Sequence, residues 1–428
     1  MALLGCIADD FTGATDLANN LVRSGMRAVQ TIGVPDGSFD GEADAIVVAL
    51  KSRTIAPADA VTQSLAALRW LLDAGARQIY FKYCSTFDST DEGNIGPVID
   101  ALLDALDADF TIACPAFPEN QRTVFKGHLF VGDQLLGDSP MRHHPLTPMT
   151  DANLVRVLQS QTRRKVGLVP YDVVARGPAA IAECFAVLHA EDIGIAVLDA
   201  ISNDDLMKIG PALAGMRLVT GGSGIAIGLP QNWRATGELA PDVPSDALPP
   251  ATGMRAVVSG SCSSATNAQV ARFRAAGGAA FAIDPLALAS DRDVVGEALR
   301  WAEPLLSQRP VLIYATAAPE AVAAVQSALG ARRAGALVEE ALARIARGLV
   351  QRGVRSIVVA GGETSGAVVQ ALGIRQLVIG SQIAPGVPWT AARSPVCDDA
   401  TLHIALKSGN FGGPDFFAQA FAALERTR

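Results

Sequence analysis

The sequence predicts an α/β protein of two α/β domains, with mainly parallel sheets and a cleft between them. Its 428 residues exceed what one domain usually holds. Short apolar runs alternate along the chain with stretches of helical periodicity, which is typical of β-α-β units. A stretch at 231–252 has little periodicity and holds four prolines. We therefore expect a first domain at 1–230, a linker at 231–252 and a second domain at 253–428.

The apolar runs predict the individual strands. Several are apolar at consecutive positions, as strands buried on both faces are. Residues 123–131 interrupt the rhythm with short apolar runs on either side of Lys126-Gly127, which predicts a hairpin. The longest helix is expected at 332–352. Strands are expected at 3–8, 45–50, 78–82, 110–114, 166–169, 193–198 and 217–220, and then at 256–259, 279–283, 311–315, 356–360, 376–379 and 403–406.

Composition excludes several classes of protein. Half of the residues are hydrophobic and 18% are charged, so the chain is not mainly disordered. The net charge is −8 and there are no basic runs, so we expect no nucleic-acid partner. No apolar run approaches the roughly 18 residues that span a bilayer, so we expect no membrane partner. The cysteines form no CxxC pair and the histidines no H-E-x-x-H pattern, which indicates a cytoplasmic protein and assigns no metal ligand.

Three turns rich in glycine and hydroxyl residues follow expected strands of the second domain, at 259–264, 361–366 and 408–413. Glycines let the backbone approach an anion, and hydroxyls add hydrogen-bond donors. One such turn is usually an ordinary strand–helix connection, but three in one domain favour an anionic ligand, most simply a nucleotide. None is a Walker A loop, and the protein-kinase signatures are absent. The candidate nucleotide-binding residues are Ser259, Ser261, Gly361, Gly362, Glu363, Thr364 and Gly409.

The strand ends of the first domain carry charged side chains instead. Asp9 and Asp10 follow the first expected strand, Arg53 follows the second, and Lys82 ends the third. Asp10 could simply cap the next helix. Together, however, these residues suit a small polyhydroxylated acid, with arginine gripping its carboxylate and an aspartate accepting a proton. We expect Asp10, ahead of Asp88, to be the general base.

These motifs resemble the four-carbon acid sugar kinase family over nearly the whole chain. The resemblance implies an N-terminal acid-sugar domain, a C-terminal ATP domain and phosphorylation of a terminal hydroxyl, with Mg²⁺ accompanying ATP. The stretch PAFPENQR at 115–122 and the opening of the chain are most similar to the branch that converts 3-oxo-tetronate to 3-oxo-tetronate 4-phosphate. The motifs are ADDFTGATD (8–16), FDST (87–90) with GNIG (93–96), SGS (259–261), GGETSG (361–366) and KSGNFG (407–412).

One departure from the family leaves the substrate less defined. Many relatives have an arginine in the segment that this chain fills with Asp91 and Glu92, so the role of carboxylate clamp is left to Arg53 or Arg122. Threonate and erythronate therefore remain alternative substrates. The candidate substrate-binding residues are Asp9, Arg53, Lys82, Ser89, Thr90 and Arg122.

Two other functions remain alternatives at this point. A non-catalytic nucleotide-binding regulator would explain the three turns, but not the acids and Lys82 of the first domain. A dehydrogenase that uses NAD is disfavoured because no G-x-G-x-x-G motif is present. The sequence leaves open whether the chain forms a homo-oligomer.

Overall fold

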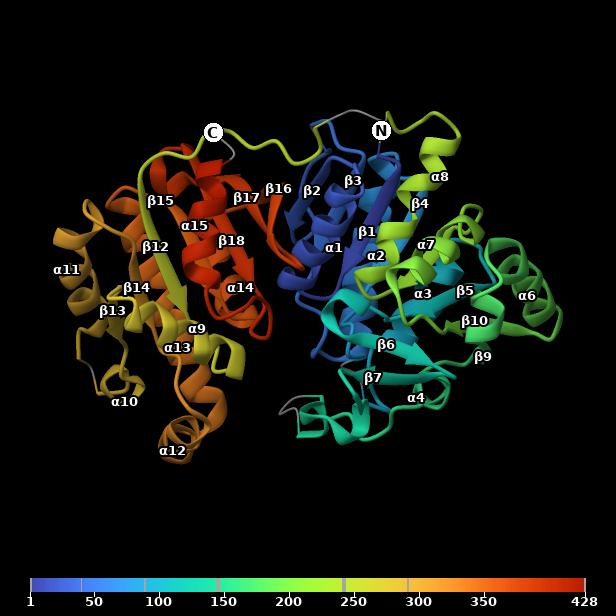
Figure 1. Cartoon of the computed structure of the whole chain (residues 1–428), viewed down its shortest axis with the longest axis horizontal. Coiled ribbons are helices and arrows are strands. Elements are labelled where there is room, and N and C mark those ends of the chain that lie inside the picture. Colours follow the sequence, from blue (N-terminus) through green and yellow to red (C-terminus); the bar gives the residue numbers. More distant parts are fainter. Residues whose placement is uncertain are drawn as a thin grey trace. The chain divides into compact units, whose positions relative to one another are not determined.

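The computed structural model describes residues 2–39, 41–87, 90–143, 147–240, 244–290 and 292–426 (Figure 1). The chain divides into two compact units. The first ends at Ser245 and the second begins at Asp246. Helix α8 (Pro230–Ala235) occupies the start of the expected linker. No helix in the described part of the chain is both long and apolar enough to cross a bilayer.

The sheet of the first unit is parallel throughout its paired strands, in the order β2-β3-β1-β4-β11-β5-β10-β9. Its central strands are buried along their whole length, which accounts for their continuous apolar sequences. The strands are β1 (Leu4–Ala8), β2 (Ala28–Ile32), β3 (Ala45–Ala49), β4 (Gln78–Lys82), β5 (Thr111–Cys114), β9 (Lys165–Val169), β10 (Ile193–Leu198) and β11 (Leu218–Gly221).

The helices of the first unit form two layers on this sheet. Contacts join α1, α7 and the 3-10 turn η4 in one layer, and α2, α3 and α4 in the other. The expected hairpin is confirmed as β6 (Arg122–Phe125) and β7 (His128–Val131), to which β8 (Gln134–Leu135) adds a third strand. The other elements are α1 (Phe11–Arg23), α2 (Pro57–Asp73), α3 (Ile95–Ala105), α4 (Leu154–Gln161), α5 (Tyr171–Val174), α6 (Pro178–Ala190), α7 (Asn203–Ala212) and η4 (Gly224–Gly228).

The sheet of the second unit has the order β13-β14-β12-β15-β18-β17-β16. It is parallel except for β17, which pairs antiparallel with both neighbours. The strands are β12 (Met254–Ser259), β13 (Ala279–Ala282), β14 (Val311–Tyr314), β15 (Val354–Ala360), β16 (Gln376–Ala384), β17 (Val387–Arg393) and β18 (Thr401–Lys407). The helices are α9 (Ser264–Ala275), α10 (Pro285–Leu288), α11 (Val294–Leu306), α12 (Pro319–Leu329), α13 (Ala331–Gln351), α14 (Gly362–Ala371) and α15 (Phe416–Arg426).

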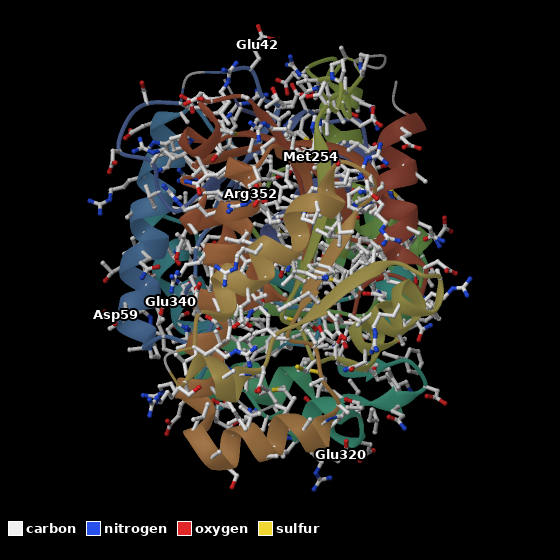
Figure 2. All side chains as sticks on the ribbon, turned by 90° about the vertical axis from the view of Figure 1, so that its left-hand side faces the viewer. Glu42, Asp59, Met254, Glu320, Glu340 and Arg352 are labelled. Carbon is white, nitrogen blue, oxygen red and sulfur yellow. The ribbon has the colours of Figure 1, made fainter. Side chains whose placement is uncertain are left out.

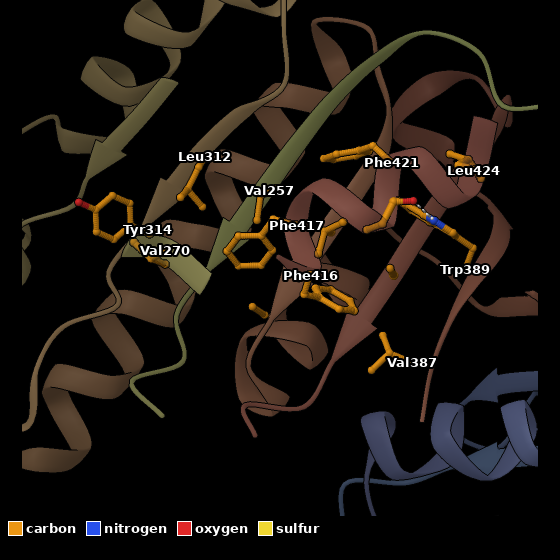
Figure 3. Packing of buried hydrophobic residues seen from close by; sticks show 14 of the residues in the cluster. Val257, Val270, Leu312, Tyr314, Val387, Trp389, Phe416, Phe417, Phe421 and Leu424 are labelled. Atoms are coloured by element: carbon orange, nitrogen blue, oxygen red, sulfur yellow. Dashed lines mark hydrogen bonds between the residues drawn. The ribbon is translucent and has the colours of Figure 1, made fainter. Parts of the chain in front are cut away.

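An aromatic cluster holds α15 and α9 against this second sheet (Figure 3). Trp389 of β17 is fully buried and donates its ring N–H to the carbonyl of Ala420 at 2.7 Å. Phe416, Phe417 and Phe421 of α15 fill the space around it. The opposite layer contains α13, the long helix expected from the sequence, whose Glu340 is exposed together with Glu320 of α12 (Figure 2).

Besides the short β8, two strands of the main sheets were missed in the sequence, and each carries a residue that is unusual in a central strand. Strand β2 carries Gln30, whose amide is buried and satisfied by Thr15 and by the carbonyl of Phe11. Strand β17 contains Pro388, which argues against a central strand in a sequence, yet its partner β16 has register shifts near this position. The other expected strands agree with the observed boundaries to within two residues, except that β16 extends to Ala384.

The first four strands of each unit have the same spatial order. In the first unit it is β2-β3-β1-β4, and in the second it is β13-β14-β12-β15. In each unit the second and third strands lie on one side of the first strand, and the fourth lies on its other side. The connections therefore diverge beside β1 and beside β12. Ligands of open parallel sheets bind at the carboxyl ends of strands at such switch points. The topology therefore defines one candidate site in each unit.

Candidate functional site

Strand register brings the charged residues of the first unit together. Ala8 of β1 lies opposite Ala49 of β3 and Lys82 of β4, so all three strands end at one level. The main chain at Asp9 then joins both neighbours, because its N–H donates to Lys82 and its carbonyl accepts from the N–H of Ser52. Asp9, Asp10, Arg53 and Lys82 are thus collected at one edge of the sheet, as the sequence predicts.

Arg53 forms a fork with the two aspartates. Its Nε and Nη2 donate to the Asp9 carboxylate at 2.9 and 2.7 Å, and Nη2 also donates to Asp10 Oδ1 at 2.7 Å. The side chains of Arg53, Asp9 and Asp10 are 22%, 8% and 23% exposed. Burial raises the pKa of Asp9, and the charge of Arg53 only partly offsets this effect. Arg53 therefore uses its bidentate geometry on protein carboxylates in this structure.

Asp10 is the N-cap of α1. Its Oδ1 accepts from the N–H of Gly13 and its Oδ2 from the hydroxyl of Thr12, both at 2.9 Å. Burial acts to raise the pKa of Asp10, but the charges of Arg53 and Lys82 and these hydrogen bonds outweigh it, so the pKa is lowered. The capping role that the sequence left open is therefore present, and the carboxylate is ionised at neutral pH. Its role as a base stays a prediction.

A third aspartate of this region was not nominated from the sequence. Asp16, on α1, is buried, and burial raises its pKa to about 7. Its Oδ2 accepts from the hydroxyl of Ser223 at 2.5 Å, while its Oδ1 has no hydrogen-bond partner among the described residues. The charges of Lys82 and Arg122 act against the rise in its pKa. Asp16 ends the ADDFTGATD motif at 8–16, and its place in that motif was the signal that could have revealed it.

The remaining substrate-binding candidates are spread along the first unit. Arg122 begins β6 and donates to the carbonyl of Asn120. Thr90 is half-buried, and its carbonyl accepts from the side-chain amide of Gln161 at 2.5 Å. Asp88 and Ser89 lie outside the described residues.

The three turns of the second unit also meet at neighbouring strand ends. Ser259 of β12 lies opposite Ala360 of β15, and Ala360 lies opposite Lys407 of β18. The N–H of Ser261 donates to Ala360 at 3.1 Å, and the N–H of Gly361 donates to Lys407 at 2.8 Å. The structure therefore brings together the turns that the sequence proposes for a nucleotide.

Helix α14 begins in this group of turns. Its N-cap, Gly361, has φ of 121°, a backbone conformation that residues with a side chain rarely adopt. A Cβ there would lie 3.1 Å from the backbone nitrogen of Ser261. The N-cap is a glycine and supplies no capping side chain, so the N–H groups of the first turn lie at the positive end of the helix dipole. This arrangement fits a phosphate group.

The other candidates surround that helix start. Ser259 is buried, and its hydroxyl forms a hydrogen bond of 2.7 Å with the hydroxyl of Thr316. Ser261 is half-buried, and a Cβ on Gly409 would lie 2.7 Å from its hydroxyl oxygen, so these two turns touch. Thr364 is buried, whereas Gly362 and Glu363 are exposed. Glycines at these contacts leave a backbone-lined cradle that a nucleotide phosphate could enter.

Comparison with known proteins assigns the chain to a family. A sugar-binding N-terminal domain matches residues 4–229, and a nucleotide-binding C-terminal domain matches residues 256–417. Proteins named 3-oxo-tetronate kinase from Cupriavidus necator and Burkholderia multivorans are 62% and 63% identical, each over 99% of this chain and 97% of the relative. The chain belongs to the four-carbon acid sugar kinase family. This result confirms the resemblance seen in the motifs.

Solved structures of family members share the fold. A Haemophilus influenzae protein is 45% identical, with a TM-score of 0.79, over 98% of this chain and 100% of its own. A Salmonella typhimurium protein is 44% identical, with a TM-score of 0.86, over 97% of this chain and 98% of its own. The prediction of an α/β fold with mainly parallel sheets is confirmed.

Replacing Arg53 by methionine should leave buried Asp9 and half-buried Asp10 without the cation to which they are hydrogen-bonded. Breaking a buried ion pair from one side costs about 3–5 kcal/mol, and we expect a loss of this size at pH 7 in urea denaturation. Without Arg53 the pKa values of Asp9 and Asp10 should rise above their ordinary range. The loss should then shrink as the pH falls, because protonation removes the unpaired charge.

The exposed pair of Arg156 with Asp151 provides the control. Arg156→Met should change stability little at any pH, because exposed ion pairs contribute little. A loss in Arg53→Met that is the same at pH 5 and pH 8 would contradict the electrostatic account of this cluster.

Gly362→Val tests the approach of phosphate to α14. Gly362 does not have a positive φ, unlike Gly361, so valine fits its backbone conformation. The added side chain should raise the KM for ATP on the order of tenfold, as expected for losing a hydrogen bond to a charged group. The KM for the sugar acid should change little. Steady-state kinetics with each substrate varied in turn measures both values.

Gly335→Val, at an exposed position of α13 where a Cβ would lie 3.8 Å from the Glu339 side chain, controls for a β-branched residue in a helix. It should leave both KM values unchanged. A folded Gly362→Val variant with unaltered ATP kinetics would remove Gly362 from the nucleotide site.

Proposed function

We propose that this chain is an ATP-dependent kinase that phosphorylates the 4-hydroxyl of 3-oxo-tetronate and releases 3-oxo-tetronate 4-phosphate and ADP. The observation that carries the proposal is the identity of 62–63%, over nearly the full length, to proteins named for this activity. The two strand-end sites supply what such a reaction needs. One is rich in carboxylates and cations, and the other is lined by backbone N–H groups.

Phosphoryl transfer mainly requires positioning and charge neutralisation. A bond forms between the substrate O4 and the γ-phosphorus, the bond from the γ-phosphorus to the bridging oxygen of ADP breaks, and the hydroxyl proton leaves. Because this proton leaves late in a loose transition state, a weakly basic carboxylate can orient the hydroxyl and then accept the proton. Asp10, ionised and held by Arg53 and the start of α1, is proposed for this role, ahead of Asp88.

The substrate carboxylate needs a separate cation. Arg53 already holds Asp9 and Asp10, so we propose that it positions these two carboxylates. Arg122 is then the first candidate to bind the substrate carboxylate, and Lys82 supplies positive charge beneath the site. Ser89 and Thr90 are proposed to bind substrate hydroxyls.

In the second unit, we propose that the start of α14 binds a phosphate through Gly361, Gly362 and Thr364, with Ser259, Ser261 and Gly409 completing the pocket. Mg²⁺ bound with ATP would neutralise phosphate charge, and it usually keeps one or two protein carboxylates as ligands. Glu363, exposed in the first turn of α14, is the acid of this chain proposed to meet it.

A coupled assay of ADP release tests the function. We expect saturable ATP turnover with 3-oxo-tetronate, and higher kcat/KM with it than with threonate or erythronate. Turnover that prefers one of those two acids would shift the assignment within the family. Nucleotide binding with no turnover of any four-carbon acid would instead support a regulator and reject the proposal.

Asp10→Asn tests the proposed base. Asparagine can still cap α1, but it cannot accept the hydroxyl proton, so kcat should fall by about 10²–10⁴-fold. Affinity for ATP, measured by calorimetry, should stay near the wild-type value. Some stability should be lost, because Asp10 also pairs with Arg53.

Asp293 provides a matched control, because it caps α11 through the same bond to an N–H three residues later, at 2.9 Å. Asp293→Asn should leave kcat unchanged. If Asp10→Asn also retains its kcat, Asp10 is only a cap, and the base must be sought at Asp88 or Asp16.

A further inference from the structure

A buried lysine lies directly beneath the third turn of the nucleotide site. Lys407, the last residue of β18, is fully buried. Its ammonium group donates to Thr266 Oγ1 at 3.0 Å and to the carbonyls of Ser408, Gly409 and Phe411 at 2.9, 2.8 and 3.2 Å. All four acceptors are neutral. Three of the four acceptors of this lysine are therefore main-chain carbonyls of the turn at 408–413.

A second side chain holds the same turn from α9. The amide nitrogen of Gln269, also fully buried, donates to the carbonyls of Phe411, Gly412 and Gly413 at 3.0, 2.9 and 3.2 Å. Lys407 and Gln269 together draw five successive or nearly successive carbonyls inward, those of Ser408, Gly409, Phe411, Gly412 and Gly413.

The direction of these carbonyls determines where the turn's N–H groups point. The described chain has no cis peptide bond, and in a trans peptide the C=O and the following N–H point in opposite directions. The N–H groups of Gly409, Asn410, Gly412 and Gly413 must therefore point away from Lys407 and Gln269. None of the four donates to another group among the described residues. Successive outward N–H groups of this kind form anion-binding concavities.

Electrostatics also favours an anion at the 408–413 turn. Burial lowers the pKa of Lys407 to about 7, which shows the cost of keeping a cation there without a carboxylate. An anion on the outer side of the turn would compensate this charge. The turn already adjoins the rest of the nucleotide site, because Gly409 touches Ser261 and its carbonyl accepts from Ser263 at 2.5 Å.

We propose that Lys407 and Gln269 are positioning residues that hold the 408–413 turn with its N–H groups outward, as a second cradle for the nucleotide polyphosphate beside the start of α14. The inference rests on the proposed function for the identity of the ligand. Neither side chain contacts the nucleotide. Each acts by orienting the backbone that does.

Lys407→Met tests this inference in the full-length chain, because methionine keeps an unbranched stem but has no charge or donor. Calorimetric titration with ATP and Mg²⁺ should show binding weakened by about 10- to 100-fold, the range for lost hydrogen bonds to a charged group. Binding of AMP, which has one phosphate, should weaken less. In kinetics the KM for ATP should rise while the KM for the sugar acid stays near wild type. Gln269→Leu should show the same pattern with a smaller change.

His403→Leu is the matched control. His403 is also buried on β18 and bonds a main-chain carbonyl, that of Pro249, outside the site. It should lose stability without changing ATP affinity. A folded Lys407→Met or Gln269→Leu variant that binds ATP like the wild type would overturn the inference, and so would a wild-type chain that binds no nucleotide. Wild-type ATP binding without turnover of a tetronate would reject only the proposed function, because the affinities of the variants still test the cradle.

Discussion

The parallel register of a few central strands is the constraint on which both sites depend. Ala8 is level with Ala49 and Lys82 in the first unit, and Ser259 is level with Ala360 and Lys407 in the second. Because these strands are buried on both faces, polar groups can emerge only where the strands end. A slip of one strand by a single residue would separate the acids from Arg53, or one glycine-rich turn from the next.

Each unit places a buried lysine at the end of a central strand, and the surroundings of the two lysines explain why the sites differ. Lys82 lies among Asp9, Asp10 and Asp16, and its charge acts to lower the pKa of each, although burial outweighs this effect at Asp9 and Asp16. Lys407 is bonded to a hydroxyl and main-chain carbonyls, so its charge is not neutralised by the protein. The surroundings of Lys82 suit proton transfer and the binding of an acidic substrate by cationic side chains. The surroundings of Lys407 leave positive potential for a polyphosphate.

Sequence reasoning succeeded where residue type and position on the strand determine the outcome, and failed where partners are distant in sequence. Arg53 could be placed near Asp9, but a carboxylate clamp for the substrate was expected, and only the structure shows its fork occupied by protein acids. Strand β2 was missed because Gln30 looks like a surface residue until Thr15 and Phe11 satisfy its amide. Lys407 ends an apolar run as Lys82 does, so the same reasoning could have found it.

The sequence by itself determined the α/β class, the strands buried on both faces, the three glycine-rich turns and the family, because continuous apolar runs and short motifs are local properties. Only the tertiary structure decided which strand ends are neighbours, since strand order depends on crossovers that pass over the sheet rather than on any one segment. It also decided in which direction the pKa of each acid shifts. Asp10 and Asp16 are six residues apart on one helix start, yet the pKa of one is lowered and that of the other is raised to about 7. The difference arises because the Arg53 guanidinium reaches Asp10, whereas desolvation dominates at Asp16.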